Sequence, residues 1–211
     1  MSSTQIIFTD NVERYRTSVL QDLKKFNITC IGEASNGLEL LRLLKDKRPD
    51  VVLLDLQMPV MNGSETLNKI AEEFPYTNVI ILSMYYEPLL VEDFIRRGAK
   101  GYIAKEELLD IRILSEAIET VKNGGIFIYP KSAALDEKAI KYTQKQKEIT
   151  PFMCQGFTNE QIAAEMNVSV RAVEKLRSKI YVKVEGEKAI DFYRYAFSKG
   201  LQFLKVIRRS K

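Results

Sequence analysis

The chain of 211 residues contains no histidine. This absence excludes histidine-based catalysis and most zinc sites, and it means that the chain is not a histidine kinase. Its only cysteines, Cys30 and Cys154, match no metal or redox spacing, so we expect reduced thiols in a cytoplasmic protein. No apolar stretch approaches the roughly 20 residues that span a bilayer, and no signal-peptide pattern opens the chain. The composition, with 45% hydrophobic and 28% charged residues, is typical of a soluble globular protein.

Acidic residues are scarce in the last third of the chain. Residues 143–211 carry 14 Lys and Arg against 7 Asp and Glu, whereas residues 1–123 carry 15 against 19. An acidic first part and a basic second part predict a regulatory domain joined to a module that binds a polyanion. A solvated basic surface without a partner is the alternative that charge alone leaves open.

Strand-like and helical patterns alternate strictly in the first 123 residues. The predicted strands are Gln5–Thr9, Thr29–Ala34, Val51–Asp55, Asn78–Ser83 and Gly101–Ala104. The predicted helices are Val12–Phe26, Gly37–Asp46, Ser64–Phe74, Leu89–Arg97 and Leu108–Lys122. This alternation predicts a doubly wound α/β domain, a (βα)5 parallel sheet with helices on both faces.

The rest of the chain shows only helical periodicity. We predict a linker over residues 124–142 with one helix, Ser132–Lys141, and a small all-α domain over residues 143–211 that ends in a basic tail. Its predicted helices are Gln144–Gln155, Asn159–Met166, Val170–Val184 and Lys188–Leu201. Thr158 and Gln161 fit a capping box, and Ser169 is a good N-cap, so short helices joined by tight turns predict a helix-turn-helix.

Polar side chains follow several of the predicted strands. Asp10 and Asn11 follow the first strand, and Asp55 ends the third, so we expect them to meet at one edge of the sheet. Neighbouring carboxylates repel each other, and a bound divalent cation such as Mg²⁺ usually neutralises this repulsion. Ser83 ends the fourth strand and Lys105 follows the fifth, and a hydroxyl and an ammonium facing Asp55 and Mg²⁺ predict a receptor for a phosphoryl group. We also expect Gly63 to allow a turn with positive φ beside the site.

These residues resemble the receiver domain of two-component response regulators. The resemblance rests on Asp10-Asn11, Asp55 to Pro59 with Gly63, Ser83, and Gly101 to Lys105. It implies that Asp55 accepts a phosphoryl group from a sensor histidine kinase, and that Mg²⁺ is held by Asp10, Asn11, Asp55 and the carbonyl of Gln57. Lys105 would pair with the phosphoryl oxygens, Ser83 would bond the phosphoryl group, and Tyr102 would rotate inward as a switch.

Asn11 departs from the family, which usually carries a second acid there. The lost charge predicts weaker Mg²⁺ binding, because the charge of the ligands governs affinity for hard cations. One alternative is therefore a receiver that works without phosphorylation. Another is an aspartyl-phosphate phosphatase on a similar sheet, although such enzymes have a second aspartate where Gln57 stands.

Residues 143–201 resemble the LuxR-type helix-turn-helix of the NarL/FixJ response regulators. The resemblance rests on Thr143, Glu148, the stretch from Gln155 to Ala163, Val168-Ser169, and the positions 173–175, 177 and 180. It implies binding to double-stranded DNA as a homodimer, with Val170–Val184 in the major groove. The candidate DNA-binding residues are Thr158, Asn159, Ser169, Arg171, Glu174, Lys175, Arg177, Ser178, Lys179 and Lys183.

The function predicted from both halves is a DNA-binding response regulator, which accepts a phosphoryl group on Asp55 but is not a turnover enzyme. Three positions favour an interaction module that has lost DNA binding. Leu176 stands where the family often has histidine, and Ala172 where it often has threonine. Pro151 falls inside a predicted helix, where proline costs about 3 kcal/mol or more, so this helix is either kinked or begins later than the resemblance implies.

Overall fold

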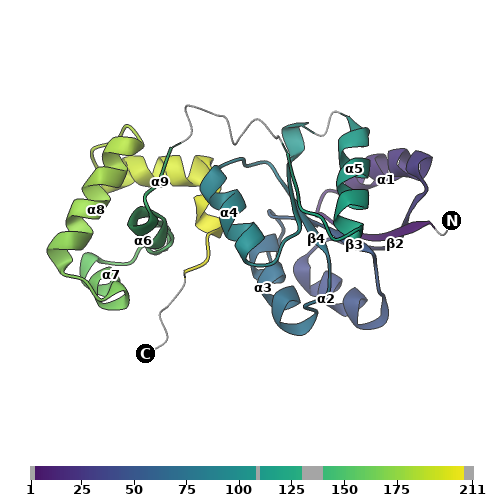
Figure 1. Cartoon of the computed structure of the whole chain (residues 1–211), viewed down its shortest axis with the longest axis horizontal. Coiled ribbons are helices and arrows are strands. Elements are labelled where there is room, and N and C mark those ends of the chain that lie inside the picture. The colour runs from purple at the N-terminus through teal and green to yellow at the C-terminus, as the bar shows by residue number, and fades with distance from the viewer. Residues whose placement is uncertain (1–2, 108–109, 130–139, 207–211) are drawn as a thin grey trace. The chain divides into compact units, whose positions relative to one another are not determined.

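The computed structural model describes residues 3–107, 110–129 and 140–206 of the chain (Figure 1). These residues form two compact units. The first unit comprises the described residues up to Met84 and those from Phe94 to residue 129. The second unit comprises Tyr85–Asp93 and the described residues from 140 onward.

The first unit is built on a parallel sheet that has six strands within the described residues, in the order β2-β1-β3-β4-β5-β6. The strands are β1 (Thr4–Thr9), β2 (Ile28–Ala34), β3 (Val51–Asp55), β4 (Val79–Ser83), β5 (Gly101–Ala104) and β6 (Phe127–Tyr129). Every residue of β3 and β4 is buried, which explains their continuous apolar sequences. The chain runs from β1 to β2 on one side and then returns for β3 on the other side of β1. Such a reversal leaves a crevice at the carboxyl ends of the strands, where ligands of these sheets bind.

Helices cover both faces of the sheet. They are α1 (Glu13–Leu23), α2 (Gly37–Asp46), α3 (Gly63–Glu73) and α5 (Ile111–Lys122). A further helix, α4 (Pro88–Arg96), is divided between the two units. Figure 1 shows α1 and α5 together on one face, with α2 and α3 on the other. The core below α1 and α5 packs Leu23, Leu114 and Ile118 against Phe8 and Leu53 of the sheet. The predicted doubly wound α/β fold is thus confirmed.

Two predictions for the linker need correction. Phe127–Tyr129 forms β6, which pairs in parallel with β5, so this part of the predicted linker is a strand of the sheet. A three-residue strand that follows two glycines gives too short a pattern to detect. Most of the predicted helix Ser132–Lys141 lies outside the described residues, but Ile140 and Lys141 are not helical, so its predicted end is wrong.

The second unit is helical, as predicted. Its helices after residue 140 are α6 (Gln144–Cys154), α7 (Asn159–Met166), α8 (Val170–Lys183) and α9 (Ala189–Ser198). The side chains of Thr158 and Ser169 cap α7 and α8, and Asn167 ends α7 with a φ of 53°. The predicted helix Lys188–Leu201 is too long, because α9 ends at Ser198 and Gly200 takes a φ of 73° before a short 3-10 turn.

Pro151 lies inside α6 without delaying its start. The helix begins at Gln144, where Thr143 and Gln146 form a capping box, so the alternative of a later start is wrong. Proline lacks an N–H group, and the carbonyl of Lys147 therefore cannot receive the usual helical hydrogen bond. Ile149, Phe152 and Met153 are buried around this position, and their packing offsets the lost bond.

Candidate functional site

The carboxylates of Asp10 and Asp55 meet at the edge of the sheet where β1 and β3 end. The pairing of Thr9 with Leu54 aligns the two strands, so the residues that follow are neighbours. Nζ of Lys105 lies 2.6 Å from Oδ2 of Asp10 and 2.8 Å from Oδ1 of Asp55. Asp10 is fully buried, and Asp55 is only 3% exposed. One ammonium group therefore serves two buried carboxylates.

The electrostatics of this pocket favour an additional positive charge. Burial raises the pKa of Asp55 above its ordinary value, Lys105 opposes that rise, and the Asp10 carboxylate adds to it. The backbone N–H of Gln57 lowers the pKa by donating a hydrogen bond to Asp55. The effect of burial on the pKa of Asp55 exceeds that of Lys105. One ammonium group therefore does not fully compensate the two carboxylates. Two carboxylate oxygens that converge on one nitrogen atom are also placed to converge on one divalent cation, so the donor set fits Mg²⁺.

The other predicted residues of the pocket differ in exposure. Ser83 is buried at the end of β4, the neighbour of β3, and Tyr102 is fully buried with its ring centre 6.1 Å from that of Phe94. Asn11 and the side chain of Gln57 are exposed. The structure thus brings Asp10, Asp55 and Lys105 into direct contact, while Asn11 lies at the solvent-facing rim.

Gly63 is required beside Asp55 for a reason other than the one predicted. Its φ is not positive, and it begins α3 with its N–H donating to the carbonyl of Leu56. A Cβ atom at this position would lie 2.1 Å from the carbonyl oxygen of Asp55, so only glycine allows the loop to close against β3. The expected positive φ occurs instead at Val60, where it is 68°.

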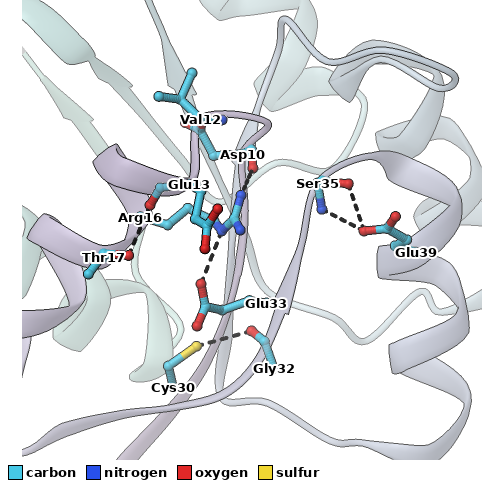
Figure 2. A network of polar contacts seen from close by, with 10 residues as sticks. All are labelled: Asp10, Val12, Glu13, Arg16, Thr17, Cys30, Gly32, Glu33, Ser35 and Glu39. Carbon is cyan, nitrogen blue, oxygen red and sulfur yellow. Dashed lines mark hydrogen bonds and ion pairs between the residues drawn. The ribbon is translucent and has the colours of Figure 1, made fainter.

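Arg16 also belongs to the pocket, although its position was not predicted from the sequence. Figure 2 shows its guanidinium between the backbone carbonyl of Asp10, to which Nη1 donates, and the Glu33 carboxylate. Its Nε lies 3.1 Å from Oε2 of Glu33, and the N–H of Val12 donates to Oδ1 of Asp10. These bonds fix the position of Asp10. Arg16 lies one turn into α1, a helix that begins soon after Asp10. A basic residue one helical turn after the start of that helix is the sequence feature that could have identified it.

The helix-turn-helix pair α7 and α8 presents a polar surface in the second unit. Val173 and Ile180 are fully buried, whereas Arg171, Glu174, Lys175, Ser178 and Lys179 are exposed on α8. A groove of about 420 Å³ beside them is lined in part by Lys145, Lys175 and Lys179. The exposed side chains of α8 therefore form a continuous, mainly basic surface, which we call the α8 face.

Several other predicted DNA-binding residues contact this unit itself. Arg177 donates to Oδ1 of Asn159 at 2.8 Å and to the hydroxyl of Tyr181 at 3.0 Å. Lys183 donates to Oε1 of Gln146 at 2.8 Å and to the carbonyl of Lys141. Thr158 and Ser169 cap helices. Arg177 and Lys183 thus lie among groups that hold α6, α7 and α8 together.

Comparisons with known proteins match both units. The family of response regulator receiver domains matches residues 6–119, and the luxR family of bacterial regulatory proteins matches residues 141–196. The chain is 32% identical over 168 residues to the uncharacterized transcriptional regulatory protein YhcZ of Bacillus subtilis (strain 168), covering 75% of this chain and 78% of YhcZ. It is 31% identical over 191 residues to the nitrate/nitrite response regulator NarL of Escherichia coli (strain K12), covering 84% and 85% of the two chains.

A solved structure also shares the fold. RcsB from Salmonella enterica serovar Typhimurium, bound to promoter rprA in the presence of the phosphomimetic BeF3-, matches with a TM-score of 0.66. The match covers 93% of this chain and 99% of that one, at 20% sequence identity. None of the helices in the described residues is both long and apolar enough to cross a membrane.

Proposed function

Because the chain belongs to the response regulators that join a receiver domain to a luxR-type domain, we propose that a sensor histidine kinase phosphorylates Asp55 to control DNA binding. The observation that carries this proposal is the buried Asp55 carboxylate at the carboxyl end of β3, 2.8 Å from Nζ of Lys105. We assign residues 1–123 together with β6 (Phe127–Tyr129) to the receiver domain, the rest of residues 124–142 to the linker, and residues 143–211 to the DNA-binding domain. We also assign the protein to the cytoplasm, where its DNA partner lies.

The transfer follows from the positions of the side chains. A carboxylate oxygen of Asp55 attacks the phosphorus atom of the kinase's phosphohistidine, and the P–N bond breaks as the P–O bond forms. The leaving imidazole nitrogen keeps the electron pair and is protonated from solvent. Lys105, already beside Asp55, pairs with the phosphoryl oxygens. Asp55 takes part in one transfer per activation, so the chain is a phosphoryl acceptor and not a turnover enzyme.

Asp10, Asp55, the Gln57 carbonyl and Asn11 are the residues that would hold Mg²⁺. When bound, the ion neutralises charge on the phosphoryl oxygens. Asn11 offers a neutral oxygen in place of a carboxylate, and this predicts weaker binding of the ion. Without an acid at position 11, Asp10 is the charged ligand that precedes α1, and its hydrogen bonds with Arg16 and Val12 fix its position.

The new group at Asp55 carries a charge of roughly −2 at neutral pH. Ser83 lies at the end of the adjacent strand and is the hydroxyl we assign to the phosphoryl group. A shift of Ser83 alters β4, which pairs with β5 beside Tyr102. Tyr102 is already fully buried against Phe94 without a phosphoryl group, so the inward rotation expected from the family has no room to occur from this structure. We assign Tyr102 instead a change in its packing on Phe94, which carries the effect to the outer surface of the receiver.

The α8 face is the surface we assign to DNA. Arg171, Lys175 and Lys179 are exposed cations that neutralise phosphates or donate to guanine edges, and Glu174 and Ser178 lie among them. Thr158, Asn159 and Ser169 lie at the helix starts that approach the DNA backbone. Two copies of the chain would bind half-sites about one helical turn apart, as a homodimer.

The test is labelling of Asp55 by acetyl phosphate at increasing Mg²⁺ concentration, measured by intact-protein mass spectrometry of the full chain. We expect one phosphoryl group on the wild type and none on Asp55→Asn. The Asn11→Asp variant should reach half-labelling at a lower Mg²⁺ concentration than the wild type, because it restores a charged ligand. Equal labelling without Mg²⁺ would contradict the assigned metal site. Absence of labelling at any Mg²⁺ concentration would favour a receiver that works without phosphorylation.

A further inference from the structure

Tyr15 lies against the acidic pocket, although no part of the proposed phosphoryl transfer uses it. It stands in the first turn of α1, and its ring packs edge-on against Phe8 with 6.0 Å between the ring centres. Nζ of Lys105 is 5.0 Å from the centre of the Tyr15 ring. This nitrogen atom is the one that binds both Asp10 and Asp55. The ring therefore forms one wall of the space around the shared ammonium group.

The hydroxyl group of Tyr15 is buried and has no hydrogen-bond partner among the described residues. A buried donor without an acceptor destabilises a folded protein, and most such groups in native proteins are paired. Burial, together with the carboxylates of Asp10 and Asp55, raises the pKa of Tyr15. The phenol thus keeps its proton and is a donor beside two acids. A donor in this position is suited to an anion that arrives in the pocket.

The phosphoryl group is such an anion. It brings acceptor oxygens and a charge of roughly −2 into a pocket where Lys105 already serves two carboxylates. Lys105 cannot satisfy every oxygen atom, and Asn11, which replaces an acid, is exposed at the rim. A neutral hydroxyl supplies a further donor without adding charge to the pocket, and a hydrogen bond to a charged acceptor is stronger than one between neutral groups.

We propose that the hydroxyl of Tyr15 donates a hydrogen bond to a phosphoryl oxygen on Asp55 and stabilises the phosphorylated receiver. This inference rests on the proposed function of Asp55. It adds a binding residue from α1 to the groups at the ends of β1, β3, β4 and β5. The aromatic ring and the hydroxyl have separate roles, because the ring contacts Lys105 and Phe8 in the unphosphorylated structure.

The test compares the full-length wild type with Tyr15→Phe, which keeps the ring and removes only the hydroxyl. Tyr76→Phe is the matched control, because Tyr76 is 97% exposed in the same unit. Each protein is titrated with beryllofluoride, a phosphoryl mimic, in the presence of Mg²⁺, and the half-life of its acetyl-phosphate-labelled form is measured. The melting temperature of each protein is also measured without ligand.

We expect Tyr15→Phe to bind beryllofluoride about tenfold more weakly and to lose its label faster, since a bond to a charged group is removed. Its melting temperature without ligand should not fall, because the hydroxyl has no partner there, and Tyr76→Phe should match the wild type. Affinity of Tyr15→Phe within twofold of the wild type would overturn the role of Tyr15 alone. A loss of affinity together with a lower melting temperature would show a structural role instead. If the wild type itself binds no beryllofluoride and takes no label, the proposed function of Asp55 fails and this inference fails with it.

Discussion

The acidic pocket and the α8 face both carry clustered charges, but only the pocket buries them. Asp10 and Asp55 are almost inaccessible and share the ammonium group of Lys105. Arg171, Lys175 and Lys179 are exposed on α8. Removing a partner from a buried pair leaves an uncompensated charge, whereas exposed charges contribute little to stability. Lys105 is therefore needed to compensate buried negative charge, whereas the cations of α8 remain available to a polyanion.

The largest effect on stability is expected from Lys105→Ala. This change leaves two buried carboxylates without their counter-ion, and the free energy of unfolding should fall by about 3–5 kcal/mol at neutral pH. Urea unfolding followed by circular dichroism measures the loss. Lys100→Ala removes a lysine whose side chain is exposed in the same unit and should change stability little. Equal effects of the two changes would show that a lysine beside buried carboxylates contributes no more to stability than an exposed one.

Asp55→Asn should have a smaller effect of opposite sign. The pKa of Asp55 is raised in the folded protein, so between the unfolded and folded pKa values the folded state binds more protons. Stability then falls as the pH rises through this interval, and the ionised group remains unfavourable above it. We expect the asparagine variant to melt at a higher temperature than the wild type at pH 7, with a gain that shrinks as the solution is acidified. Asp46→Asn, at an exposed position, should show no such gain. A lower melting temperature for Asp55→Asn than for the wild type would show that burial of the Asp55 carboxylate is not destabilising.

Thr158→Ala tests whether a hydroxyl, without any charge, holds the helix-turn-helix together. The Thr158 hydroxyl accepts from the N–H of Gln161, and the Gln161 side chain accepts from the N–H of Thr158. Loss of an N-cap costs about 1 kcal/mol. Thr158→Ser keeps the hydroxyl and should retain most of the stability in the same urea titration. If serine were as destabilising as alanine, the cap would not be the cause.

The smallest effect on stability is expected from the double change Lys175→Ala and Lys179→Ala. Both side chains are exposed, so the free energy of unfolding should change by no more than about 0.5 kcal/mol. The slope of the logarithm of DNA affinity against the logarithm of salt concentration should fall by roughly 1–2 units, because each phosphate contact releases counterions. Fluorescence anisotropy at several salt concentrations measures the slope. The control, Lys24→Ala with Lys25→Ala, removes the same charge from the first unit. An equal fall of the slope for that pair would show that the α8 face makes no specific contact with DNA phosphates.

Much of the fold was predictable because its signals are local. The apolar run Val51–Asp55 and the caps at Thr158 and Ser169 agree with the structure, since burial and capping act on residues close in sequence. β6 was missed because a strand of three residues after two glycines is too short to give a recognisable pattern. Pro151 was overestimated as a helix breaker, because packing of its buried neighbours is not visible in a helical pattern.

The pocket was predictable only in part. The positions of Asp10, Asp55 and Lys105 follow from strand ends, which a parallel sheet brings to one edge. The contacts of Arg16 and Tyr15 depend on how α1 turns relative to the sheet, and the need for glycine at position 63 depends on an approach to the backbone of Asp55. Such close approaches depend on the placement of whole elements and not on residue spacing.

Control of DNA binding by phosphorylation of Asp55 can be measured on the full chain. The measurement is the affinity of the full chain for a promoter fragment by fluorescence anisotropy, at fixed salt and Mg²⁺, with and without acetyl phosphate, for the wild type and Asp55→Asn. We expect acetyl phosphate to change the affinity of the wild type and to leave that of Asp55→Asn unchanged. An equal response of both proteins, or no response of a wild type shown to be labelled on Asp55, would contradict it.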